Sequence, residues 1–150
     1  MMQMLEAGGA KLLIDGERVA DVDNPKGYYE WEQIKQTGKK PEVLDTEGLD
    51  GRAIKCISML LQQMPLKHNY KVIFMTRPIE GHRNETLHWL KSVPHMEFIE
   101  IDYPTLIRNP EPEISHLVEF LGADRLPNSA EMARVIDPAL HRNRARAPRV

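Results

Sequence analysis

The sequence has little cysteine and few aromatic residues: Cys56 is the single cysteine, and aromatic residues make up 6% of the 150 positions. A lone cysteine excludes an internal disulfide and a metal site built from several cysteines. No apolar run approaches the roughly 18 residues that indicate a membrane span, and residues 1–6 lack the basic and apolar segments of a signal peptide. These absences predict a cytoplasmic protein with no membrane partner.

The chain also lacks an excess of either charge, because 20 basic residues balance 22 acidic ones and leave a net charge of -2. This balance gives no general attraction to nucleic acid, so none is expected as a partner. The six histidines are scattered and predict no metal site. Apolar content of 41% and a length of 150 residues are typical of one globular domain. The prediction is a single domain over 1–150, in which 141–150 form a basic, flexible tail.

Short apolar runs alternate with helical patterns along the chain. A continuous apolar run at 70–75 suits a parallel strand covered on both faces. At 111–121, apolar residues recur at helical spacing and Gly122 follows. The other predicted strands are 11–14, 52–58 and 96–103. The other predicted helices are 1–7, 28–36, 59–64, 80–92 and 129–136. This alternation predicts an α/β fold, a mainly parallel sheet flanked by helices.

Three segments, in order, carry a family resemblance. They are Met-Met-Gln-Met-Leu-Glu-Ala-Gly-Gly at 1–9, Asp-Asn-Pro-Lys-Gly-Tyr-Tyr-Glu at 23–30, and Tyr-Lys-Val-Ile-Phe-Met-Thr-Arg-Pro at 70–78. Weaker matches follow at 101–103 and 136–142. Together they resemble the bacterial sulfotransferase-like proteins of the P-loop superfamily. The resemblance implies a three-layer architecture and a donor nucleotide, 3′-phosphoadenosine 5′-phosphosulfate.

In this family a strand and a Gly-rich phosphate loop lead directly into the helix that 1–9 resembles. Such a loop cradles the phosphosulfate with backbone N–H groups. Residues 1–150 do not supply it, because the glycines at 8 and 9 follow the helix and those at 48 and 51 lack a strand–loop–helix context. The resemblance thus predicts a truncated version of the architecture. The strand would lie in the middle of the sheet, and its absence exposes a sheet edge, which predicts a homodimer.

The resemblance also assigns a nucleotide contact. Arg77 follows the apolar run at 70–75, as does the family's arginine that contacts the 3′-phosphate of the nucleotide. The family has a serine eight positions later, where this chain has Glu85, whose carboxylate would repel a phosphate. An arginine at the end of a strand is also common in surface ion pairs. Both interpretations of Arg77 stay open.

The turn-rich segment at 23–30 offers the candidate substrate-binding residues Lys26, Tyr28, Tyr29 and Glu30. They would line a pocket for an acceptor molecule. The alternative is a turn whose tyrosines pack on the core and keep their hydroxyl groups in water. No residue is assigned as a catalytic base.

Two functions follow from these patterns. The first is a non-catalytic, degenerate sulfotransferase-like module that binds a small anionic or nucleotide ligand or a protein partner. The second is an active sulfotransferase whose phosphate loop lies outside these 150 residues and which uses 3′-phosphoadenosine 5′-phosphosulfate as sulfuryl donor.

Overall fold

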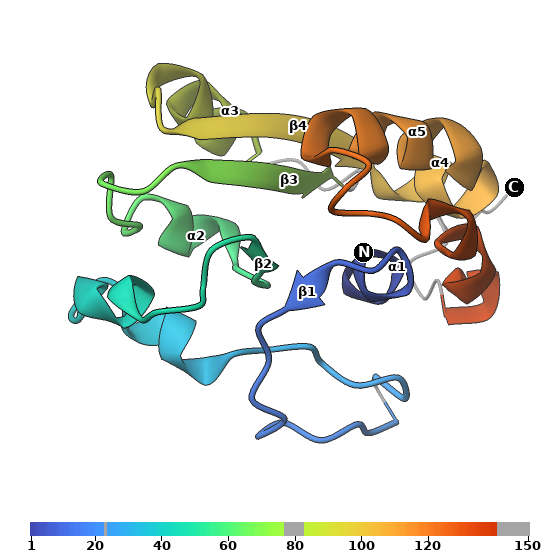
Figure 1. The fold of residues 1–150 in the computed structure, drawn as a ribbon, viewed down its shortest axis with the longest axis horizontal. Coiled ribbons are helices and arrows are strands. Elements are labelled where there is room, and N and C mark those ends of the chain that lie inside the picture. Colours follow the sequence, from blue (N-terminus) through green and yellow to red (C-terminus); the bar gives the residue numbers. More distant parts are fainter. Residues whose placement is uncertain (23, 77–82, 141–150) are drawn as a thin grey trace, which may run out of the picture.

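The strands form two separate parallel pairs in the computed structural model, which describes residues 1–22, 24–76 and 83–140 (Figure 1). Strand β1 (Lys11–Leu12) pairs with β2 (Arg52–Ala53), and β3 (Tyr70–Thr76) pairs with β4 (Met96–Asp102). The α/β class and the parallel pairing are confirmed. The single continuous sheet is wrong for the described residues, because β2 and β3 are not paired with each other.

The β3–β4 pair is the longer one, in register from Tyr70 opposite Met96 to Thr76 opposite Asp102. Parallel neighbours need a crossover connection, and helix α3 (Arg83–Ser92) lies in this one. The apolar run of β3 alternates between two cores: Ile73 and Met75 pack against the first, and Val72 and Phe74 against the second. The strand predicted to be covered on both faces is therefore confirmed.

The two cores lie on opposite sides of β3. Buried residues of the first core are Met4, Leu5, Ile99, Ile101, Leu106, Leu117, Leu126 and Met132. Buried residues of the second core are Trp31, Ile34, Leu44, Leu61, Met64, Leu87, Leu90 and Met96. The first core joins helix α1 (Met2–Ala7) to helix α5 (Pro110–Leu121), and the second joins the 3₁₀ turn η1 (Glu32–Gln36) to α3.

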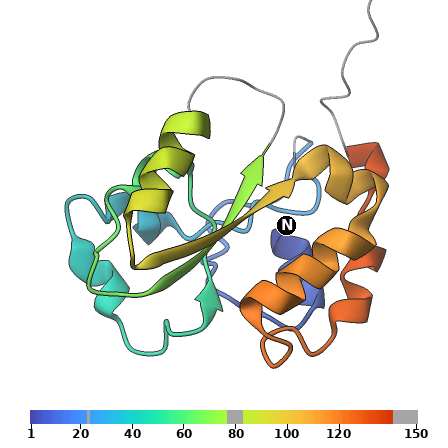
Figure 2. The same cartoon turned by 90° about the horizontal axis from the view of Figure 1, so that it is seen from above.

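Helix α1 (Met2–Ala7) agrees with the prediction at 1–7 and sends Met4 and Leu5 into the first core. It packs against the turns after α5, as seen from above in Figure 2. Gly9 turns the chain toward β1 with a φ of 96°, and a Cβ there would lie 2.9 Å from Pro127 Cγ. Both the backbone angle and the close approach require glycine at this position.

Helix α5 (Pro110–Leu121) confirms the prediction at 111–121, and Gly122, with a φ of 100°, ends it. The preceding helix α4 (Tyr103–Arg108) was not predicted, since 96–103 was interpreted as strand to its last residue. Asp102 caps α4 through its carboxylate, which accepts from Thr105 N at 3.0 Å and Thr105 Oγ1 at 2.7 Å. Because the cap begins α4 at Tyr103, strand β4 ends at Asp102, one residue before the predicted end.

The strands predicted at 11–14 and 52–58 are much shorter in the structure, two residues each. Pairing ends after Leu13 N donates to Ala53 O, because the chain beyond β1 turns to meet a different segment. There Asp15 N donates to Glu30 O at 3.2 Å. Beyond β1 the backbone therefore forms its hydrogen bonds with the loop around Glu30 and not with the segment after β2.

Three of the predicted helices also change. The segment 28–36 is helical only as the 3₁₀ turn η1 (Glu32–Gln36), 59–64 becomes α2 (Ser58–Leu61), and 129–136 divides into η3 (Ser129–Glu131) and η4 (Ala133–Val135). The turns η2 (Pro41–Asp45) and η5 (Pro138–Leu140) were not predicted. None of the described helices is long and apolar enough to cross a membrane. The predicted tail at 141–150 lies outside the described residues.

Candidate functional site

The carboxyl ends of β1 and β2 are covered by the loop between β1 and η1, which forms a wide arc below β1 in Figure 1. Lys55 lies two residues beyond β2 and reaches this loop. Its Nζ donates to Tyr28 O at 2.8 Å and to Glu30 Oε1 at 3.0 Å. Ligands of open α/β sheets bind at the carboxyl ends of parallel strands, so this edge is the place to look for a site.

Two further cations complete a group that we call the Glu30 cluster: Arg18, Tyr28, Glu30, Lys35 and Lys55. The Arg18 guanidinium lies 3.4 Å from the centre of the Tyr28 ring, a cation–π contact. Its Nη1 is 3.6 Å from Glu30 Oε1, and Lys35 Nζ is 3.7 Å from Glu30 Oε2. Three basic side chains thus surround one carboxylate.

Glu30 is the most enclosed charged group of the cluster, with a side chain that is 18% exposed. The hydrogen bond from Lys55 lowers the pKa of Glu30, and the charges of Lys55, Arg18 and Lys35 act in the same direction against the opposing effect of burial. Glu30 is therefore ionised at neutral pH. It holds the cations in place and is a weak proton acceptor.

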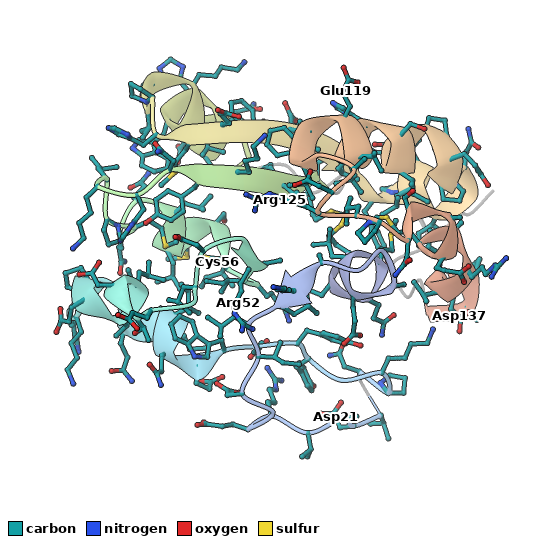
Figure 3. All side chains as sticks on the ribbon, viewed as in Figure 1. Asp21, Arg52, Cys56, Glu119, Arg125 and Asp137 are labelled. Carbon is teal, nitrogen blue, oxygen red and sulfur yellow. The ribbon has the colours of Figure 1, made fainter. Side chains whose placement is uncertain are left out.

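Two aspartates fix the loop that carries the cluster. Asp15 accepts from the backbone N of Glu32 at 2.5 Å and of Glu17 at 3.0 Å, and these bonds lower the pKa of Asp15. Asp21, which lies on the outer part of the loop in Figure 3, accepts from the Tyr28 hydroxyl at 2.7 Å. The ring of Tyr28 is thereby held at both its face and its hydroxyl group.

The four predicted substrate-binding residues separate into two groups. Tyr28 and Glu30 meet in the cluster. Lys26 instead donates to Val135 O at 3.3 Å, and the Tyr29 hydroxyl donates to Glu6 Oε2 at 2.9 Å. Tyr29 is held at a φ of 54°, a strained value for a residue with a side chain.

The alternative interpretation of this segment was a turn whose tyrosines pack on the core and keep their hydroxyl groups in water. The structure agrees with the packing but not with the free hydroxyl groups. Tyr28 is buried, with 8% exposed, but its hydroxyl is bonded to Asp21 and does not rely on water. Burial and the hydrogen bond to Glu6 raise the pKa of Tyr29. Through its hydrogen bond to Glu6, Tyr29 attaches the loop to α1. Through its hydrogen bond to Val135 O, Lys26 attaches the loop to the turns after α5.

Sequence reasoning missed the three cations of the cluster. Lys55 lies in the middle of the strand predicted at 52–58, and only the early end of β2 at Ala53 places it beyond the strand. Arg18 and Lys35 belong to no pattern in the sequence, and only the fold brings them to Glu30.

The other candidates contribute less. Arg77 lies outside the described residues, although Thr76 just before it ends β3. Burial raises the pKa of Cys56 to about 11, so its sulfur is a neutral thiol, as expected for an inert cysteine (Figure 3). No group of three His, Cys, Asp or Glu side chains in the described ranges could hold a metal ion.

The fold and the site define an α/β protein with a charged cluster at the carboxyl edge of a parallel strand pair. Comparisons with protein-family models, curated proteins and solved structures found no match.

Proposed function

We propose that this chain is a sulfotransferase-like module of the P-loop superfamily that binds a small anionic or nucleotide ligand and does not catalyse a reaction through residues 1–150 alone. The Glu30 cluster carries the proposal, because it gathers three cations at the edge where open α/β sheets bind ligands. The ordered resemblance of the segments at 1–9, 23–30 and 70–78 supports the family.

Binding is favoured over catalysis by the state of the groups at this edge. Glu30 is ionised and already accepts a hydrogen bond from Lys55, which makes it a poor general base. Cys56 is a neutral thiol and thus a poor nucleophile. Neither residue is prepared for proton transfer or covalent attack.

A titration with adenosine 3′,5′-bisphosphate tests the nucleotide part of the proposal. We expect binding with a micromolar Kd, because arginine and lysine side chains form charge-assisted hydrogen bonds to phosphate. Arg77→Ala should weaken binding by about tenfold or more, equivalent to about 1.4 kcal/mol. The matched Arg134→Ala, which removes a 74% exposed arginine paired with Glu131, should leave it unchanged. The absence of heat at millimolar ligand would overturn a nucleotide ligand.

A second candidate is the active enzyme, favoured by the separation of the two strand pairs. A strand leading into α1 could form hydrogen bonds with the edges of β2 and β3, which within the described residues pair only with β1 and β4. In such an enzyme the acceptor oxygen would bond to sulfur while the bond from sulfur to the nucleotide phosphate breaks, and a base would take the hydroxyl proton. Failure of the chain extended by such a strand and phosphate loop to transfer labelled sulfuryl groups would exclude it.

The same open edges support a homodimer as part of the proposal. A strand edge with free N–H and C=O groups tends to pair with another chain. We expect the mass of a dimer in light scattering at high protein concentration. A monomer at every concentration would contradict this expectation.

A further inference from the structure

A hollow of about 430 Å³ lies between η1, η2 and the residues that follow α2 (η1 light blue and η2 turquoise in Figure 1). Its lining consists of Lys35, Thr37, Gly38, Lys39, Pro41 and Gln63. Both charged residues of this lining are lysines, and Glu42, which follows Pro41, is not part of it. The hollow is thus lined by positive charge alone and has the volume of a small-molecule site.

The turn that forms one wall of the hollow is held by its own hydrogen bonds. Thr37 is 1% exposed, and its hydroxyl donates to Ile34 O at 2.7 Å. The backbone N–H groups of Lys39 and Lys40 both donate to Gln36 O at 2.8 Å. The shape of the wall therefore does not depend on a ligand.

The two lysines of the lining differ in their partners. Lys35 pairs with Glu32 and Glu30 and lies near enough to Asp15 to lower the pKa of that carboxyl, so its charge is compensated. Lys39 forms no ion pair with any of the described residues, and its amino group donates no hydrogen bond to them. The uncompensated charge at the hollow is therefore that of Lys39.

The opposite wall carries the carboxamide of Gln63, which packs directly on Gly38. A Cβ at Gly38 would overlap Gln63 Oε1, so the absence of a side chain at position 38 makes room for this carboxamide. Within the part of the chain that the structure describes, the carboxamide has no hydrogen-bond partner. Its NH₂ group is a donor that a ligand can use.

From these observations we infer that the hollow between η1 and η2 binds a small oxyanion such as phosphate, which accepts hydrogen bonds from the side chains of Lys39, Lys35 and Gln63. Ammonium groups are donors only, and an oxyanion offers acceptor oxygens together with the opposite charge. A neutral apolar molecule would remove the ammonium groups from water without bonding them. The inference goes beyond the proposed function, because this site shares only Lys35 with the Glu30 cluster.

The test is an NMR titration of the whole chain with inorganic phosphate at constant ionic strength. We expect saturable shifts of the backbone amide signals of Gly38, Lys39 and Gln63. Lys39→Met should weaken phosphate binding by about tenfold, because it removes one hydrogen bond between charged groups. Lys40→Met is the matched control: Lys40 is exposed and adjacent but does not line the hollow, so its loss should weaken binding by no more than about twofold.

Gly38→Ala tests the other wall. The new Cβ would displace the end of the flexible Gln63 side chain and not the backbone, so this variant is expected to fold and to bind phosphate severalfold more weakly. Equal weakening by Lys39→Met and Lys40→Met would overturn the inference in favour of diffuse surface attraction. Shifts that do not saturate, or that chloride reproduces, would also overturn it. The bisphosphate titration depends on Arg77 and this one on Lys39, so either proposal can fail without the other.

Discussion

Replacing Leu117 with alanine is expected to lower the free energy of unfolding by about 2 to 5 kcal/mol. Leu117 lies on α5 and is 0% exposed in the first core, together with Ile101 of β4 and Leu106 of α4. Removal of its branched end would leave a cavity among three different elements, and a closely packed core collapses only partly around such a cavity. Urea denaturation followed by circular dichroism measures the change.

Leu66→Ala is the matched control, because its side chain is 54% exposed. We expect it to change the free energy of unfolding by no more than about 0.5 kcal/mol. A loss below about 1 kcal/mol for Leu117→Ala would contradict the packing of α5 against β4, which joins the C-terminal half of the chain to the sheet.

The elements that could be predicted from the sequence are those with complete local signals. Helix α5 has apolar residues at helical spacing, a proline in its first turn and a glycine after its end. Strand β3 has a continuous apolar run. The missed helix α4 also had a signal, since Asp102 followed by Pro104 and Thr105 is typical of a helix start.

The predictions that were wrong concern segments whose structure depends on partners far away in the sequence. The run at 52–58 is apolar enough for a strand, but its length is set by β1, from which it separates after Ala53. Residues 28–31 were expected to begin a helix, yet Tyr28 and Glu30 are held by Lys55 and Asp21, whose contacts outweigh the local preference. Tertiary contacts of this kind produce no periodic pattern in the amino-acid sequence.

The candidate site was predictable only in part for the same reason. Glu30 and Tyr28 stand in a recognisable polar turn. The cations that surround Glu30 come from positions 18, 35 and 55, and three elements of the fold bring them together. The loop from 15 to 31 contributes both the anion and one cation, so its path decides whether the site exists.

Lys55→Met is expected to lower the free energy of unfolding by about 1 to 2 kcal/mol at neutral pH, because Glu30 loses its shortest charged hydrogen bond and the Tyr28 carbonyl loses its donor. This loss is at the low end of what a hydrogen bond between charged groups contributes to the free energy of unfolding, because the Lys55 side chain is 40% exposed to water. Lys35→Met is the control: Lys35 is 53% exposed and 3.7 Å from Glu30, so its loss should cost no more than about 1 kcal/mol.

The pH dependence of the free energy of unfolding distinguishes the two hydrogen bonds of Lys55, one to Glu30 and one to the Tyr28 carbonyl. The pKa of Glu30 is lowered in the folded protein from an ordinary value of 4.5, so its ion pairing stabilises the fold fully above that pH and is lost as the pH falls through the lower, folded pKa. The bond to the Tyr28 carbonyl does not involve the Glu30 carboxylate, so protonation of Glu30 leaves it in place. The difference between wild type and Lys55→Met, measured by urea denaturation from pH 7 to pH 3, should therefore narrow in acid without vanishing. A difference that stays constant would show that Lys55 stabilises the loop through Tyr28 alone, and Glu30 would then no longer be the centre of the site.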